Sequence, residues 1–497
     1  MEAAVTSAHG SEKLRSTVVW GAMINVVFAV VGGALTFLQF LLVVRLAGPA
    51  EIGLYAMASV FATTLESVSD FGIGDRLIQR DADRLHESYS VAATAHFLLA
   101  LLLWILVLIT APGIARFYHQ PRLWALLSVM SYEAFYGLGR LPLSLLSREF
   151  KYLQQRLLMF IGRVAGFVVT VAMAYAGFGV WSLVIGAMVA LVATGAPAWI
   201  LADLKPKWKI DMRELRSLVD FSGPLWIGRM TMIAVQQGTI LVLSLFLSTS
   251  EVGQYKAAEQ IVFFIVSIDV ILGQTIFPAL CKLRESPERI GAGFTKASRA
   301  SMLWIPGIGI GMVCFAEAIV RYLLTTKWAG AELFVRAQGI ALVVGGVGYS
   351  WALLFETKGN TRPILNVIAV LGAAFLFLFF PLTWMFGKAG AAVGVIAVCS
   401  AGFAAKQYYI NRLHMGVSLF NIVRRSLVAA LSAGSVVFGI RRVFHPSAGL
   451  EALIVQLLAY SAVYGAILAW SERTLLADVF RVLRRRNQTM QLASAAD

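Results

Sequence analysis

The sequence is dominated by unbroken apolar runs that are long enough to cross a lipid bilayer. A helix needs about 20 apolar residues to span the hydrocarbon core, and the stretch from Val18 to Val44 contains 27 residues without Asp, Glu, Lys or Arg. Runs such as Phe97 to Ile109 and Ile368 to Phe380 continue the pattern. Because strands of a membrane barrel alternate apolar and polar residues, these continuous runs predict an all-α polytopic membrane protein.

The low charge content excludes a soluble globular protein. Only 14% of the 497 residues are charged and 59% are hydrophobic, whereas globular chains carry about 25% charged residues. The three cysteines, Cys281, Cys314 and Cys399, stand singly in apolar surroundings, without a second Cys or a His at ligand spacing. The sequence therefore predicts no disulfide, no metal site, no cofactor and no catalytic residue.

Hydropathy and turn residues together predict fourteen transmembrane helices. Pro and Gly punctuate several of the short connections, as at Gly48-Pro49 and Ala111-Pro112-Gly113. The predicted spans cover residues 18–44, 51–78, 88–110, 122–146, 157–176, 179–202, 217–248, 252–280, 297–320, 330–355, 364–386, 389–412, 421–440 and 450–470.

The basic residues lie on one side of this topology. With the N-terminus inside, 30 of the 42 Lys and Arg residues fall in inner segments, nine in outer segments and three within spans. Cytoplasmic loops of membrane proteins carry the Lys/Arg excess, so both termini are predicted to be cytoplasmic. Basic loops beside an anionic leaflet also explain the net charge of +15 without a nucleic-acid partner.

A short motif recurs between the two halves of the chain. Glu51-Ile-Gly-Leu-Tyr-Ala-Met-Ala58 returns 200 residues later as Glu251-Val-Gly-Gln-Tyr-Lys-Ala-Ala258, and each copy opens a span on the outer side. The repeat contains six spans and predicts two pseudo-symmetric six-helix lobes plus two C-terminal helices. The predicted divisions are a cytoplasmic tail 1–17, a first lobe 18–202, a basic linker 203–216, a second lobe 217–412, two further spans within 413–470 and a basic tail 471–497.

The residues around the first motif carry a family resemblance. Leu46 to Ala56, followed by Asp70-Phe-Gly-Ile-Gly and by Leu77-Ile-Gln-Arg80, resembles the polysaccharide exporters of the multidrug/oligosaccharidyl-lipid/polysaccharide (MOP) superfamily. Within that superfamily the chain is similar to the Wzx-type flippases of bacterial capsule, exopolysaccharide and O-antigen lipopolysaccharide synthesis. The resemblance extends over nearly the whole chain in length, span count and repeat, while the sequence motif itself is short.

The resemblance implies both a fold and an activity. The implied fold has two six-helix lobes and two extra helices, and the implied activity moves an undecaprenyl-diphosphate-linked oligosaccharide to the outer leaflet of the bacterial inner membrane by alternating access. The chain would then be a transporter and not an enzyme. Its implied partners are the lipid-linked oligosaccharide and membrane lipid, with a proton or Na⁺ and the polysaccharide assembly machinery as further candidates.

Polar side chains inside predicted spans are the candidates for substrate binding, because burying them in lipid is costly unless they face a cavity. Arg163 and Arg229 lie near the middle of their spans. An Arg stays charged when desolvated and offers a fork of donors to phosphate oxygens. Each arginine has an equally plain structural interpretation, an ion pair with a buried carboxylate. The amides expected to bind sugar hydroxyls or neighbouring helices are Asn25, Gln39 and Gln237.

Four carboxylates inside spans are candidates for coupling transport to an ion. Glu66 and Asp70 are four residues apart and share a helix face. Two such carboxylates in a low dielectric cannot both ionise cheaply, which makes the pair a candidate proton or cation site. Glu133 and Asp269 are the other two. The competing interpretation of all four is permanent pairing with Arg163 or Arg229.

Three other functions compete with this one. A drug exporter of the same superfamily would move amphiphilic cations through an acidic cavity, and the four carboxylates outnumber the two mid-span arginines. A membrane polymerase or ligase acting on the same lipid carrier would need a sizeable outer loop, and all predicted outer loops are short. A peptidoglycan lipid II flippase gathers arginines near its first two spans. This chain has only Arg45 there, at an outer end, and this difference argues against that function.

The topology can be tested by side-specific labelling. In a cysteine-free background, single cysteines beside Lys207, Arg289 and Arg484 should react with a membrane-impermeant maleimide only from the cytoplasmic side. Cysteines beside Gly48 or Lys388 should react only from outside, because the basic residues mark the inner loops. Labelling near Lys207 from the outside would contradict the fourteen-span arrangement.

Overall fold

The computed structural model describes most of the chain. The backbone is described for residues 2–74, 77, 82–281, 286–356, 360, 362–444, 449–475 and 477. Side chains are described in the same ranges except at residues 2–23, 82, 221, 224–225, 227–229, 231–232, 235, 270–281, 287, 349–350 and 444.

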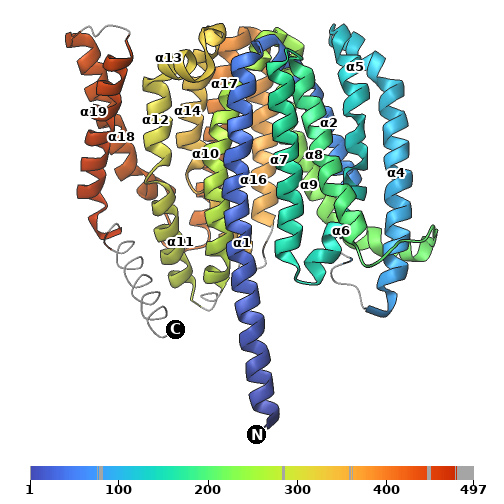
Figure 1. The fold of residues 1–497 in the computed structure, drawn as a ribbon. Helices are drawn as coiled ribbons and strands as arrows, with labels where there is room; N and C mark the ends of the chain where they lie inside the picture. The colour runs from blue at the N-terminus through green and yellow to red at the C-terminus, as the bar shows by residue number, and fades with distance from the viewer. Residues whose placement is uncertain are drawn as a thin grey trace. The chain divides into compact units, whose positions relative to one another are not determined.

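The chain divides into two compact units, residues 1–260 and residues 261–497. Within the described part of the chain the regular structure is entirely helical (Figure 1). The first unit contains α1 (Glu2–Leu46), α2 (Pro49–Asp70), α4 (Ala82–Phe117), α5 (Pro121–Met130), the 3-10 helix η1 (Ser131–Phe135), α6 (Tyr136–Arg148), α7 (Tyr152–Tyr175), α8 (Val180–Leu201), α9 (Met212–Phe246) and the beginning of α10 (Thr249–Cys281).

The second unit contains the rest of α10 and the helices that follow it. These are α11 (Pro287–Ser301), α12 (Ile305–Cys314), α13 (Ala316–Ala318), the π-helix η2 (Ile319–Leu324), η3 (Thr326–Ala331), α14 (Glu332–Gly346), η4 (Tyr349–Ala352), α15 (Leu353–Glu356), α16 (Arg362–Ala374), the π-helix η5 (Phe375–Phe379), α17 (Phe380–Asn411), α18 (Leu419–Phe444) and α19 (Leu450–Ser471).

The predicted fold class is confirmed, because each of the fourteen predicted spans falls on helical structure. Ten helical segments of the described residues are by themselves long and apolar enough to cross a membrane. The number is lower than fourteen partly because some spans are broken and others are merged. The span predicted at 122–146 consists of α5, η1 and α6, and the segment 362–411 contains two predicted spans in succession.

A glycine turn separates those two successive spans and repeats a turn of the first unit. Gly387 has φ 54° and ψ −128° inside α17, and Gly179 before α8 has φ 54° and ψ −126°. Only glycine adopts this backbone conformation without strain. Each glycine follows a phenylalanine and precedes the sixth helix of its predicted lobe. This second matched pair supports the duplication predicted from the Glu-x-Gly-x-Tyr motif.

The two copies of the Glu-x-Gly-x-Tyr motif contact each other within the first unit. A Cβ atom on Gly53 would overlap the carbonyl oxygen of Thr249, and a Cβ atom on Gly253 would overlap the carbonyl oxygen of Pro49. The two contacts are related by the 200-residue spacing of the repeat. The motif glycines are therefore needed for a close, pseudo-symmetric crossing of α2 and the start of α10.

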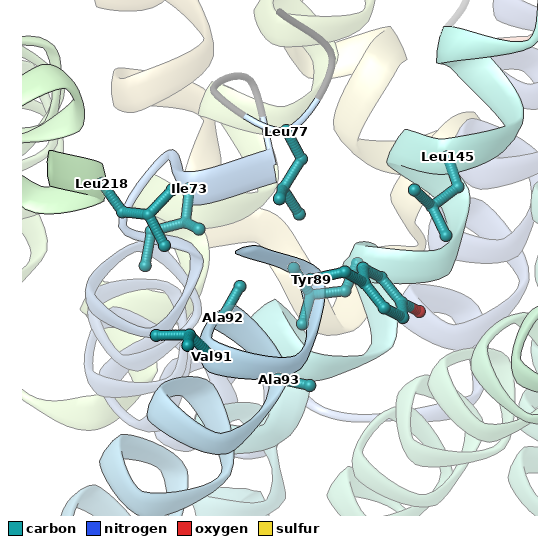
Figure 2. Packing of buried hydrophobic residues seen from close by; sticks show 9 residues of the cluster. Ile73, Leu77, Tyr89, Val91, Ala92, Ala93, Leu145 and Leu218 are labelled. Atoms are coloured by element: carbon teal, nitrogen blue, oxygen red, sulfur yellow. The ribbon is translucent and has the colours of Figure 1, made fainter. Parts of the chain in front are cut away.

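A buried apolar cluster holds together the segments that follow α2 with α4, α6 and α9. Figure 2 shows this cluster, which includes Leu77, Tyr89, Leu145 and Leu218. Leu77, Tyr89 and Leu218 are completely buried. Ahead of Leu218, α9 begins at Met212 because the Asp211 side chain accepts hydrogen bonds from the backbone N–H groups of the first turn. These bonds, from Glu214 and Arg213, lower the pKa of Asp211.

Small residues bring α7 and α8 into close contact. A Cβ atom on Gly162 would overlap the Thr194 hydroxyl, and one on Gly166 would lie 2.7 Å from the carbonyl oxygen of Gly186. Glycines spaced by four residues let membrane helices approach with their backbones. Arg163, between these two glycines on α7, contacts Gly32 of α1 and lies beside α2 and α6.

In the second unit, α19 is attached to α12 by tyrosines. The hydroxyl of Tyr460 donates to the carbonyl of Gly307 at 2.7 Å, and the hydroxyl of Tyr464 donates to Leu303 at 3.1 Å. A Cβ atom on Gly307 would lie 2.5 Å from the Tyr464 ring. The glycines of α12 thus serve helix packing, which is how membrane proteins commonly use small residues.

Candidate functional site

The first unit encloses a cavity of about 390 Å³ that is lined by ionisable side chains. It lies among α2, α4, η1, α6, α7 and α8. Its polar lining residues are Glu66, Asp70, His96, Glu133, Tyr136, Arg140, Ser144, Ser147, Gln155, Arg163 and Thr194. Three of the four predicted coupling carboxylates and one of the two predicted arginines therefore share one cavity.

An ion pair joins α2 to α6 at the edge of this cavity. Nη1 of Arg140 lies 3.1 Å from Oδ2 of Asp70. The Asp70 side chain is 15% exposed, while that of Arg140 is 51% exposed. Asp70 is thus paired with a cation, as one of the two sequence interpretations expected, and the partner that the structure gives is Arg140.

Tyrosine hydroxyls lie beside the other two carboxylates of the cavity, that of Tyr136 beside Glu66 and that of Tyr132 beside Glu133. The Tyr132 hydroxyl donates to the carbonyl of Val184 at 3.3 Å. Glu133 belongs to η1, the 3-10 segment that interrupts the fourth span. A mid-helix 3-10 segment often marks a functional hinge. Here it turns Glu133 and Tyr136 toward the carboxylates of α2.

The cavity exists partly because α2 ends inside the unit at Asp70. Phe71 follows with φ 25° and Gly72 with φ 75°, and a non-glycine residue at positive φ is strained. Two side chains of α9 bind this end of α2. The hydroxyl of Ser222 donates to the carbonyl of Gly72 at 3.0 Å, and the indole N–H of Trp226 donates to Ser67 at 3.1 Å. The Asp-Phe-Gly motif therefore terminates α2 and fastens it to α9.

Two predicted amides lie in the contact between α1 and α7 and do not line the cavity. The Asn25 side-chain oxygen accepts a hydrogen bond from Nε of Arg156 at 2.7 Å. The Gln39 amide donates to the Thr170 hydroxyl at 3.0 Å. Both amides thus bind a neighbouring helix, which was the alternative interpretation of each.

The remaining predicted site residues lie on α9 and α10. Gln237 is half-buried on α9 and is not among the lining residues. Arg229 also lies on α9, but its side chain falls outside the described residues. Asp269 belongs to the second unit, where it is 3% exposed and is hydrogen-bonded by Ser301. Its Oδ1 atom has no hydrogen-bond partner among the described residues.

Sequence reasoning missed Arg140, Tyr136 and Arg156. It assigned both arginines to inner loops by counting charges, and it did not consider tyrosine. A signal was nevertheless present. Arg140 follows Glu133 by seven residues, two helical turns, and this spacing puts both on one helix face. His96 also lines the cavity, and its Nδ1 atom lies 2.9 Å from the carbonyl oxygen of Ala92, one turn earlier in α4.

The arrangement can bind an anion and can also exchange a proton or a monovalent cation. Two guanidinium groups offer donors to phosphate or carboxylate oxygens, and three carboxylates surround them. Among the described residues no group of three or more His, Cys, Asp or Glu side chains is placed to hold a metal ion. The chemistry of the lining therefore points to binding and charge exchange.

The chain is similar to a known protein family and to a named transport protein. A family model described as "Polysaccharide biosynthesis protein" matches residues 42–332, more than half of the chain. Among similar proteins, the "Succinoglycan biosynthesis transport protein ExoT" of Rhizobium meliloti (strain 1021) is 23% identical over 488 residues. That match covers 93% of this chain and 95% of the relative.

Solved structures share the fold at low sequence identity. A lipid II flippase, MurJ, in an inward closed conformation superimposes with a TM-score of 0.74 at 13% identity, covering 92% of this chain and 100% of the flippase. An inward-facing multidrug resistance transporter of the MATE family, within the MOP superfamily, gives a TM-score of 0.59 at 16% identity. That match covers 80% of this chain and all of the transporter.

The ion pair between α2 and α6 can be tested by a mutant cycle. Replacing Asp70 with Asn should lower the free energy of unfolding by about 1–2 kcal/mol, because it removes the negative charge that lies 3.1 Å from Arg140. Adding Arg140→Gln should cost less than the sum of the two single changes. Asp220→Asn, in the exposed Arg216–Asp220 pair, is the matched control with an expected effect near zero.

Denaturant unfolding in detergent micelles measures all four variants. Strict additivity of Asp70→Asn and Arg140→Gln would show that the pair contributes no coupling energy.

Proposed function

The chain belongs to the polysaccharide biosynthesis protein family, and from this premise we propose that it carries a lipid-linked oligosaccharide across the bacterial inner membrane. The proposed substrate is an undecaprenyl-diphosphate-linked repeat unit of an exopolysaccharide, capsule or O-antigen. The names of the similar proteins support the substrate class, since one is a succinoglycan transport protein and another a lipid II flippase. The proposal makes the chain a transporter and not a catalyst.

The observation that carries the proposal is a guanidinium group in a membrane-embedded cavity. Arg163 is the twelfth of the 24 residues of α7, and it lines the cavity of the first unit. A charged residue at such depth costs about 2.5–3.5 kcal/mol on insertion scales, so it usually marks a ligand or ion route. A diphosphate headgroup supplies the matching negative charge, and a guanidinium can bind it with two parallel hydrogen bonds.

The size of the cavity suits a headgroup and not a whole repeat unit. Its volume of about 390 Å³ is at the lower end of ligand pockets, which are about 300–1,000 Å³. Serine, threonine and glutamine side chains of the lining offer hydrogen bonds to a first sugar. We therefore place the diphosphate and its nearest sugar in the cavity, with the prenyl chain in lipid.

The carboxylates provide a basis for coupling the movement to an ion gradient. The carboxylates of Glu66 and Asp70, both on α2, are close enough to repel each other. Glu133 adds a third carboxylate near Glu66. Closely spaced carboxylates share protons or bind a cation because their charges repel. A change in solvation between two conformations would change that occupancy, which is the requirement for coupling.

A second candidate function is the export of amphiphilic cations. It is favoured by the excess of three carboxylates over two guanidinium groups in the cavity and by the fold shared with a multidrug transporter. Accumulation of a fluorescent cationic dye distinguishes the two functions. Dye accumulation that rises in cells lacking the protein, while polymer export is unchanged, would favour the cation exporter.

The remaining expectations form part of the same proposal. Both termini are placed in the cytoplasm, and the lobes are assigned to residues 18–202 and 217–412, joined by the basic linker 203–216. The substrate would enter from the inner leaflet and leave to the polysaccharide assembly machinery outside. These assignments follow from the distribution of Lys and Arg and from the repeat.

The substrate contact predicts the effect of changing Arg163. In reconstituted vesicles, Arg163→Ala should reduce flipping of a fluorescent undecaprenyl-diphosphate oligosaccharide by at least tenfold, and Arg163→Lys should restore only part of it, because Lys lacks the fork of donors. Arg336→Ala is the control. Arg336 also lies within a predicted span, but it pairs with Glu332 in the second unit. Normal flipping by the Arg163→Ala variant would remove this residue from the substrate site.

Ion coupling predicts a separate defect for the α2 carboxylates. The double variant Glu66→Gln/Asp70→Asn should lose the stimulation of flipping by an imposed proton or Na⁺ gradient while still binding substrate. One charge crossing 100 mV supplies about 2.3 kcal/mol, so the stimulation should be large enough to measure. Glu332→Gln serves as the control. An unchanged gradient response in the double variant would exclude this pair as the coupling site.

A further inference from the structure

Polar contacts between α1 and α7 recur every seven residues along both helices. The inner contact joins Asn25 to Arg156, and the outer contact joins Gln39 to Thr170. In each contact the two residues are 131 positions apart in the sequence. A constant separation means that the two helices run parallel and in register, and a seven-residue spacing keeps successive contacts on one seam.

The middle position of this seam pairs Gly32 with Arg163. Gly32 follows Asn25 by seven residues, and Arg163 follows Arg156 by seven residues. The guanidinium group of Arg163 lies directly over the Cα atom of Gly32. A Cβ atom there would overlap Nη1 and would lie 2.8 Å from Cζ. The carbonyl oxygen of Gly32 already accepts a hydrogen bond from Thr36 at 3.0 Å.

We propose that Gly32 is a positioning residue for Arg163, and this inference rests on the proposed function. The missing side chain forms a notch in α1, and the notch receives the Nη1 end of the Arg163 guanidinium while the side chain lines the cavity. The contacts above and below hold α1 and α7 in register, so the notch stays opposite Arg163. Gly32 thereby determines how strongly the cavity prefers an anionic headgroup over a neutral one.

Orientation matters because a guanidinium binds a phosphate best through two parallel hydrogen bonds. A long side chain that must find this orientation at each binding event loses rotamer freedom, and a preorganised one does not. The notch holds the side chain at its Nη1 end, and the Nε–Nη2 edge is the pair of donors that we assign to a phosphate. The group that would meet a new Cβ atom is the far end of a flexible side chain and not backbone, so a substitution moves Arg163 and leaves the helices in place.

The neighbouring residue provides a matched control. A Cβ atom on Gly33 would meet nothing within 4 Å, although Gly33 lies in the same helix one position further on. Replacing either glycine by Ala favours the helix to the same degree. A purely structural role of Gly32 would lower thermal stability, whereas a positioning role leaves stability equal to that of Gly33→Ala and lowers only the anion preference.

The test measures charge preference in lipid nanodiscs. Binding of undecaprenyl diphosphate and of the neutral alcohol undecaprenol is compared for each variant, together with thermal stability. We expect the wild type and Gly33→Ala to prefer the diphosphate to the same extent. Gly32→Ala should reduce this preference by roughly tenfold. In an Arg163→Ala background, Gly32→Ala should have no further effect.

Each outcome identifies which idea fails. Absence of any diphosphate preference in the wild type would overturn the proposed function of the cavity. A wild-type preference that Gly32→Ala retains in full would overturn the positioning role while leaving the function intact. Equal losses in Gly32→Ala and Gly33→Ala, or a Gly32→Ala loss that persists without Arg163, would also overturn it, because the effect would then come from α1 as a whole.

Discussion

The structure depends on the cost of placing charge in a membrane interior. Each charged side chain inside the bilayer must find a partner within the protein, and the first unit meets this demand by concentrating its charges around one cavity. Asp70 pairs with Arg140, and tyrosine hydroxyls lie beside Glu66 and Glu133. Pairing of this kind lowers the free-energy cost of burying the charges in the ligand-free protein. The same charges remain available to a charged ligand.

Interrupted helices create the space in which these charges meet. The fourth span changes to a 3-10 helix at Ser131–Phe135, and the second ends at Asp70, followed by the strained Phe71. Interrupted helices at membrane depth are tolerated where they line a cavity. Ser222 and Trp226 of α9 bind the end of α2. A change in the charge of Asp70 would therefore act on a backbone segment that is hydrogen-bonded to α9.

The fold was more predictable than the site. Long apolar runs indicate the number and order of the spans. The repeated Glu-x-Gly-x-Tyr motif predicted a duplication, which the reciprocal contacts of Gly53 and Gly253 support. The site depends on helix rotation and on breaks, which hydropathy does not encode. Arg140 looks like a loop residue by charge counting, and Asn25 and Gln39 look like cavity residues until their partners on α7 are known.

Photo-crosslinking from α8 tests the central claim most directly, namely that an anionic lipid headgroup occupies the cavity of the first unit. Thr194 lines that cavity, whereas Val192 on the same helix is 55% exposed at the outer surface of the unit. With a photoreactive residue at each position, a short-chain prenyl diphosphate sugar should crosslink at 194, and an excess of undecaprenyl diphosphate should compete it away. Crosslinking at 192 with none at 194 would show that the headgroup passes elsewhere.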